Sequence, residues 1–172
     1  MKKILSLLVI ISVLNVANAQ DKQIISLGAS PHLLLNGAYD YDDTPVLHIS
    51  FRWLTSFESG NEIGTKASFA NLQPYQYFDY GFLYNRNIKI FKNEKFETLA
   101  GADMGLIVRT YPGYDTQKVY FDYGINAQIR FWISDKFGVY ITGDIGPRND
   151  LDYYGDHQAI HYNTEVGAQF SF

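Results

Sequence analysis

Residues Lys118 to Ile133 read KVYFDYGINAQIRFWI, and this stretch decides the fold. Its odd positions carry only apolar or aromatic residues, whereas no aliphatic side chain occurs at its even positions. Because the side chains of a strand point alternately to opposite faces, the pattern predicts one strand between two different environments. Strands in soluble proteins usually have roughly 3–10 residues, so a strand of about 16 residues must cross something thick.

The same alternation recurs in seven other segments and brings the predicted number of strands to eight. It also explains why a chain with 47% hydrophobic residues has a mean hydropathy of only −0.16. A polytopic helical membrane protein, which needs repeated runs of roughly 20 apolar residues, is excluded. With no cysteine, a disulfide scaffold is excluded as well. The seven segments are residues 23–35, 46–57, 62–71, 75–91, 96–111, 137–146 and 158–172.

The amino-terminal segment has the pattern of a secretory signal peptide. Lys2 and Lys3 precede an apolar run over residues 4–14, and Ala17 and Ala19 form an A-x-A cleavage signal. We therefore expect a signal peptide over residues 1–19 and a single β-barrel domain over residues 20–172. The leader holds two lysines and no acid, so its removal lowers the net charge from −4 to −6. An exported chain of this charge is not expected to bind nucleic acid.

The connections between the predicted strands alternate in length. Those after the second, fourth and sixth strands are short and polar, at residues 58–61, 92–95 and 134–136. Three of the others are longer, at residues 36–45, 111–117 and 147–157, whereas residues 72–74 make a short one. This is typical of outer-membrane barrels, whose short turns face the periplasm. An even number of strands then places both termini on the periplasmic side.

The carboxyl-terminal stretch YNTEVGAQFSF, residues 162–172, carries the strongest family likeness. It alternates and ends in an aromatic residue, as in the small eight-stranded outer-membrane barrels of the OmpA/OmpX type, which the chain resembles over its whole length after residue 19. The resemblance implies an all-β, eight-stranded antiparallel up-and-down transmembrane β-barrel in the outer membrane. It also implies that Phe172 serves as a recognition signal for the barrel-assembly machinery. Aromatic residues would mark the two membrane interfaces, with Trp53, Phe57, Phe131, Phe170 and Phe172 toward the periplasm and Tyr80 and Tyr162 farther out.

An eight-stranded barrel has a lumen just wide enough to be filled by side chains. Because an unpaired buried charge is costly, we expect the inward charges to pair and to plug the lumen. A gated proton or ion path is the alternative. The inward charged set comprises Arg52, Lys66, Arg109, Arg130, Asp79, Glu97, Asp103, Asp122, Asp144 and Glu165.

Signals for chemistry are weak. His48 and Ser50 have the His-x-Ser spacing of an outer-membrane lipid A deacylase, but that site must face lipid, and the alternation turns both residues into the lumen. Neither a Gly-x-Ser-x-Gly elbow nor a glycine-rich phosphate loop occurs. We therefore expect no catalytic, cofactor-binding or metal-binding residue.

The predicted outer rim is acidic. A calcium loop begins at Asp150 but fails, with Tyr154 and His161 where ligands belong, and His157 with His161 gives only a weak zinc signal. A solvated acidic rim is the expectation, formed by Asp40, Asp42, Asp43, Asp115, Asp150, Asp152 and Asp156.

The expected function is that of a non-enzymatic, monomeric outer-membrane protein with a structural or surface-interaction role. Its partners would be outer-membrane lipid and an extracellular molecule at loops 36–45, 111–117 and 147–157. Two alternatives stay open. A soluble periplasmic lipocalin-like barrel binding an apolar ligand would show the same alternation with its faces reversed, and a lipid-modifying outer-membrane enzyme would use the barrel as a scaffold.

Overall fold

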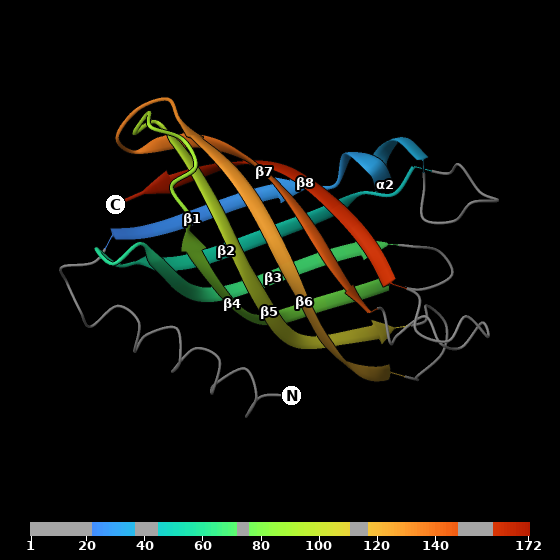
Figure 1. Ribbon diagram of the computed structural model, residues 1–172. Helices are drawn as coiled ribbons and strands as arrows, with labels where there is room; N and C mark the ends of the chain where they lie inside the picture. Colours follow the sequence, from blue (N-terminus) through green and yellow to red (C-terminus); the bar gives the residue numbers. More distant parts are fainter. Residues whose placement is uncertain (1–21, 37–44, 72–75, 111–116, 148–159) are drawn as a thin grey trace.

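The structure, a computed structural model, describes residues 22–36, 45–71, 76–110, 117–147 and 160–172. Within these residues eight strands pair in sequence order, each antiparallel to the next, and β1 pairs with β8 to close the barrel (Figure 1). The predicted antiparallel up-and-down barrel is thereby confirmed. No described helix is long and apolar enough to cross a membrane. The strands are β1 (Lys22–Ala29), β2 (His48–Ser56), β3 (Asn61–Asn71), β4 (Gln76–Asn87), β5 (Phe96–Thr110), β6 (Gln117–Trp132), β7 (Phe137–Pro147) and β8 (Ile160–Ser171).

One end of the barrel, here called the turn end, carries the connections at residues 57–60, 88–95 and 133–136, together with the start of β1 and the end of β8. Two backbone hydrogen bonds of 3.0 Å join Gln23 and Phe172 reciprocally at this end. The last residue of the chain therefore extends the seam that closes the barrel. The opposite end, where α2 (Pro31–Asn36) lies, is here called the loop end.

The first predicted strand, residues 23–35, is wrong beyond Ala29. The chain leaves the sheet there and forms α2, a short helix in which the Leu34 N–H donates to the Ser30 carbonyl at 3.2 Å. Pro31 has no N–H for a ladder and suits the first position of a helix. Leu33, expected to face outward, instead packs against a buried apolar cluster at the loop end.

The fourth predicted strand, residues 75–91, is wrong beyond Asn87. The Asn87 side-chain oxygen accepts a hydrogen bond from the Lys89 N–H at 2.9 Å, and Lys89 has a φ of +48°. This local turn takes the chain out of the sheet, so residues 88–91 belong to the connection.

The two faces of the sheet differ as the alternation predicts. On β6, Phe121 and Ile125 point outward and are 54% and 62% exposed, whereas the inward Gln128 and Arg130 are almost fully buried. Exposed large apolar side chains occur on the outward faces of all eight strands, among them Leu27, Phe51, Phe69, Phe82, Leu106, Ile125, Ile141 and Phe170. The apolar surface of the barrel is therefore on its outside.

Candidate functional site in the barrel lumen

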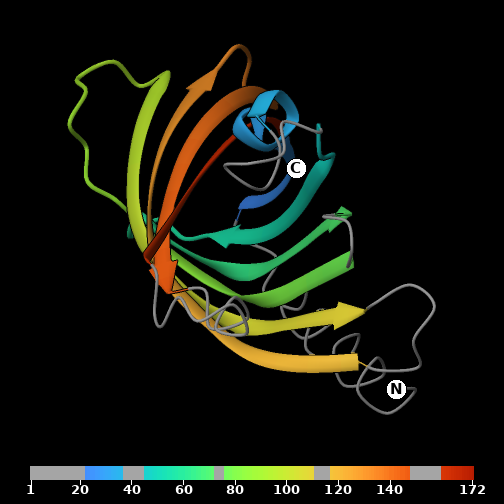
Figure 2. The same ribbon diagram turned by 90° about the vertical axis from the view of Figure 1, so that its right-hand side faces the viewer.

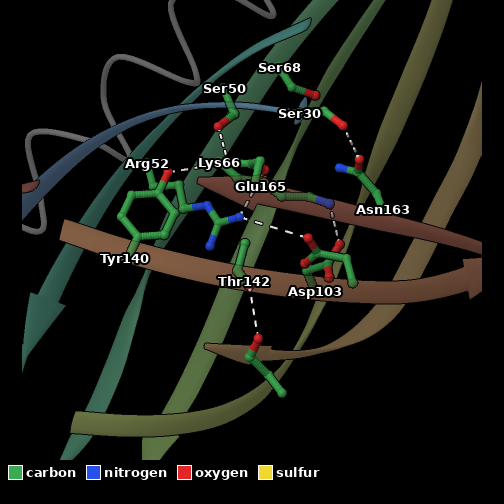
Figure 3. A network of polar contacts seen from close by, with 12 residues as sticks. Ser30, Ser50, Arg52, Lys66, Ser68, Asp103, Tyr140, Thr142, Asn163 and Glu165 are labelled. Carbon is green, nitrogen blue, oxygen red and sulfur yellow. Dashed lines mark hydrogen bonds and ion pairs between the residues drawn. The ribbon is translucent and has the colours of Figure 1, made fainter. Parts of the chain in front are cut away.

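The first of three charged clusters in the lumen centres on Arg52. Its Nη2 lies 3.0 Å from Glu165 Oε2 and 3.9 Å from Asp144 Oδ2. The Tyr140 hydroxyl donates to Glu165 Oε1 at 3.2 Å, and the Ser50 hydroxyl donates to the same oxygen. Figure 3 shows Arg52, Tyr140 and Glu165 converging from different strands. The Glu165 carboxylate thus accepts hydrogen bonds at both oxygens.

Glycines make room for this cluster. Tyr140, Gly167 and Gly28 lie in register on β7, β8 and β1. A Cβ at Gly167 would come within 2.7 Å of two ring carbons of Tyr140, and a Cβ at Gly28 would overlap the Tyr140 hydroxyl oxygen. The Tyr140 ring therefore crosses the seam between the first and last strands, which only residues without a side chain permit.

The second cluster places one lysine among three aspartates. Lys66 Nζ lies 3.3 Å from Asp79 Oδ2 and 3.4 Å from Asp122 Oδ2, and it also pairs with Asp103. These side chains come from β3, β4, β6 and β5, so the cluster ties together four strands.

The third cluster surrounds Arg130, which is fully buried. Its guanidinium makes two contacts with the Glu62 carboxylate, at 2.6 and 3.0 Å, and a third with Glu97 Oε2 at 2.9 Å. Such bidentate pairs are the strongest kind of charged contact. Glu62 was not among the predicted inward charges, although it alternates with Gly64 and Lys66 and so lies on the inward face. Arg109, the remaining basic residue of the predicted inward set, is also fully buried. Its guanidinium lies 5.7 Å from the Tyr120 ring centroid.

Two layers of apolar side chains are also buried inside the barrel, one at each end, and the alternation did not predict them. At the turn end, Lys22 Nζ lies 4.0 Å from the centroid of the Trp132 ring, which is part of a buried cluster with Ile24, Leu54 and Leu83. At the loop end, Leu33 of α2 and Tyr120 pack against a cluster of Val46, Ala70, Tyr77 and Ile107. Figure 2 shows α2 at this end of the barrel. Apolar and charged groups therefore share the interior of the barrel, with one apolar layer at each end.

The His48–Ser50 pair lies inside the barrel and does not face lipid. Both residues are about 97% buried inside the barrel, as the alternation predicts. The Ser50 hydroxyl donates to Glu165 in the first cluster. The ring of His48 instead lies 6.1 Å from that of Tyr77.

The predicted acidic rim lies outside the described residues, as do His157, the side chain of His161 and the failed calcium loop at residues 150–155. The same holds for the predicted signal peptide and for nearly all of the three long loops. These expectations stay predictions.

The comparisons support the fold. No protein-family model and no curated protein sequence matches the chain. Among solved structures, Neisserial surface protein A is 6% identical with a TM-score of 0.58, covering 88% of this chain and 96% of that one. The Yersinia pestis outer membrane protein Ail, in a phospholipid bilayer nanodisc, is 12% identical with a TM-score of 0.56, covering 89% and 100%. The chain thus has the fold of the small eight-stranded outer-membrane β-barrels.

Proposed function

We propose that this protein is an integral outer-membrane β-barrel that performs no catalysis and displays its loops at the cell surface. The observation that carries the proposal is the distribution of side chains, with apolar groups outside and paired charges inside. The outward-facing apolar side chains of the eight strands form what is here called the apolar belt. A soluble protein would have to expose this whole belt to water. A lipocalin-like barrel would need an apolar lumen, whereas the lumen here is filled by charged and hydrogen-bonded groups.

The proposed orientation places the turn end in the periplasm and the loop end at the cell surface. The signal peptide at residues 1–19 would direct export, and the strand ending at Phe172 would be recognised by the barrel-assembly machinery. The monomer is the proposed state, because the closed barrel leaves no strand edge for a second copy. A surface role would then rest on the loops at residues 36–45, 111–117 and 147–157.

A closed lumen is part of the proposal. The two apolar layers and the three charged clusters inside the barrel support a plug, not a path for ions. The pairing of Ser50 with Glu165 argues against the lipid-modifying alternative.

Membrane fractionation combined with a heat-shift gel tests the membrane assignment. The expected result is a protein that sediments with outer membranes and migrates differently before and after boiling, because a closed barrel resists detergent at room temperature. A periplasmic soluble protein of similar mass, carried through the same fractionation, is the control. Recovery in the soluble fraction with one gel position would refute the proposal.

A further inference from the structure

The connection between β4 and β5, residues 88–95 with the sequence IKIFKNEK, differs from the other two at the turn end. Figure 2 shows it leaving the barrel wall and projecting to one side. It carries three exposed lysines, Lys89, Lys92 and Lys95, and follows the exposed Arg86. In a chain with a net charge of −4, this is a local excess of positive charge.

The connection also exposes apolar side chains. Ile88, Ile90 and Phe91 are 46%, 65% and 44% exposed. The Phe91 ring lies 5.6 Å from that of Phe96, which lies 4.7 Å from that of Phe131. Since Phe96 and Phe131 are on the outward face of the barrel, the connection continues the apolar belt at its turn-end edge.

Hydrogen bonds fix the shape of this segment. The Ile88 N–H donates to the Thr98 carbonyl at 2.8 Å, and the Asn93 side chain accepts from the Lys95 N–H at 3.0 Å. Lys89 has a φ of +48°, where glycine or asparagine is favoured over lysine. Lys89 thus keeps a positive charge at a position where the backbone conformation favours glycine or asparagine.

We propose that the β4–β5 connection binds anionic phospholipid headgroups in the inner leaflet of the outer membrane. Its lysines would contact the phosphates while Ile88, Ile90 and Phe91 enter the edge of the acyl region, a combination that suits a charged membrane interface. The inference rests on the proposed function, since it requires the apolar belt to lie in a membrane.

The test measures lipid preference at the connection itself. The only two tryptophans, Trp53 and Trp132, are replaced by phenylalanine, and Phe91→Trp supplies a single probe. The full-length chain is refolded into phosphatidylethanolamine vesicles containing phosphatidylglycerol, with bromine on the acyl chains of one lipid or the other. We expect brominated phosphatidylglycerol to quench the probe about threefold more strongly at equal mole fraction and low salt.

Three variants test whether the lysines of the connection cause its preference for phosphatidylglycerol. Replacing Lys89, Lys92 and Lys95 together with glutamine should bring the quenching ratio close to one, whereas Lys136→Gln, at the same end but outside the connection, should leave it unchanged. Lys89→Gly should lower the ratio without lowering stability, because glycine accepts the backbone conformation. Equal quenching by the two lipids in the parent, or an unchanged ratio in the triple variant, would overturn the proposal. So would binding of the connection to peptidoglycan sacculi without a lipid preference.

A second tryptophan probe distinguishes failure of the headgroup proposal from failure of the membrane assignment. Trp53 alone, with Trp132→Phe, should be quenched by both brominated lipids, since it faces outward. If it is not quenched, the membrane assignment itself fails. Quenching of Trp53 together with a Phe91→Trp probe that shows no preference would refute the headgroup proposal alone.

Discussion

The side chain of Tyr140 depends on two glycines that lie beside it on β8 and β1, Gly167 and Gly28. Its hydroxyl also binds Glu165, which in turn pairs with Arg52. One aromatic residue thus connects the barrel seam with the first charged cluster. The sequence placed Tyr140, Gly28 and Glu165 on the inward face, but alternation alone does not reveal which inward residues on distant strands touch.

Gly28→Ala tests this contact. The added Cβ would overlap the Tyr140 hydroxyl and lie 2.7 Å from Glu165 Oε1, so we expect the free energy of unfolding to fall by about 1–3 kcal/mol. Urea unfolding in vesicles, followed by tryptophan fluorescence, measures the change. Gly143→Ala is the matched control, because a Cβ there meets nothing within 4 Å. Equal stability of the two variants would contradict the packing described.

Lys66→Met tests the second cluster. Removal of the base leaves Asp79, Asp103 and Asp122 without their shared partner, and we expect a loss of about 3–5 kcal/mol in unfolding free energy. Adding Asp79→Asn and Asp103→Asn to Lys66→Met should restore part of that loss. Lys136→Met, at an exposed position, should change stability by no more than about 0.5 kcal/mol. A Lys66→Met protein as stable as the parent would show that the cluster does not stabilise the barrel.

Among the elements, β3, β5, β6 and β7 were predicted to within one residue at each end, and the longest of them, β6, runs from Gln117 to Trp132 where residues 118–133 alternate without interruption. The two strands that were predicted too long end where local hydrogen bonds take the chain out of the sheet, although the alternation of apolar and polar residues continues. Pro31 starts a helix after β1, and Asn87 ends β4 through its bond to the Lys89 N–H. Two-residue periodicity contains no information about either event.

Arginine scanning along β6 tests the membrane at the scale of one element. Ile125 lies near the middle of the strand and faces outward, so Ile125→Arg should cost about 2–4 kcal/mol in a bilayer. Ile133→Arg, just beyond the turn end of β6, should cost about 0–1 kcal/mol. Refolding equilibria in vesicles give both values. Equal costs at the two depths would mean that no bilayer surrounds β6.

At the scale of the whole molecule, the sequence could predict a barrel with a polar lumen but not the layers within it. The turn-end layer is built from Ile24, Leu54, Leu83 and Trp132, each next to polar residues or glycine along the inward face of its strand. Isolated residues of this kind carry no pattern, and they meet only because the closed barrel brings β1, β2, β4 and β6 together. The long loops, where the proposed surface role resides, are likewise beyond what periodicity can describe.

If the lumen is closed, as proposed, the barrel should carry no steady current. The three charged clusters and two apolar layers inside the barrel should prevent ion flow, so a planar-bilayer recording of the refolded protein should show no regular conductance steps. Steady, uniform steps would contradict the plug. A known porin in the same bilayer provides the positive control.

If the apolar face of the barrel contacts lipid and the polar face does not, the two tryptophans must differ in their contact with lipid. Trp53 faces outward on β2, whereas Trp132 faces inward on β6 and is 6% exposed. In single-tryptophan proteins refolded into vesicles of brominated phospholipid, made with Trp132→Phe or Trp53→Phe, we predict strong quenching of Trp53 and little quenching of Trp132. Equal quenching of the two, or stronger quenching of Trp132, would mean that the apolar face of the barrel is not the face in contact with lipid.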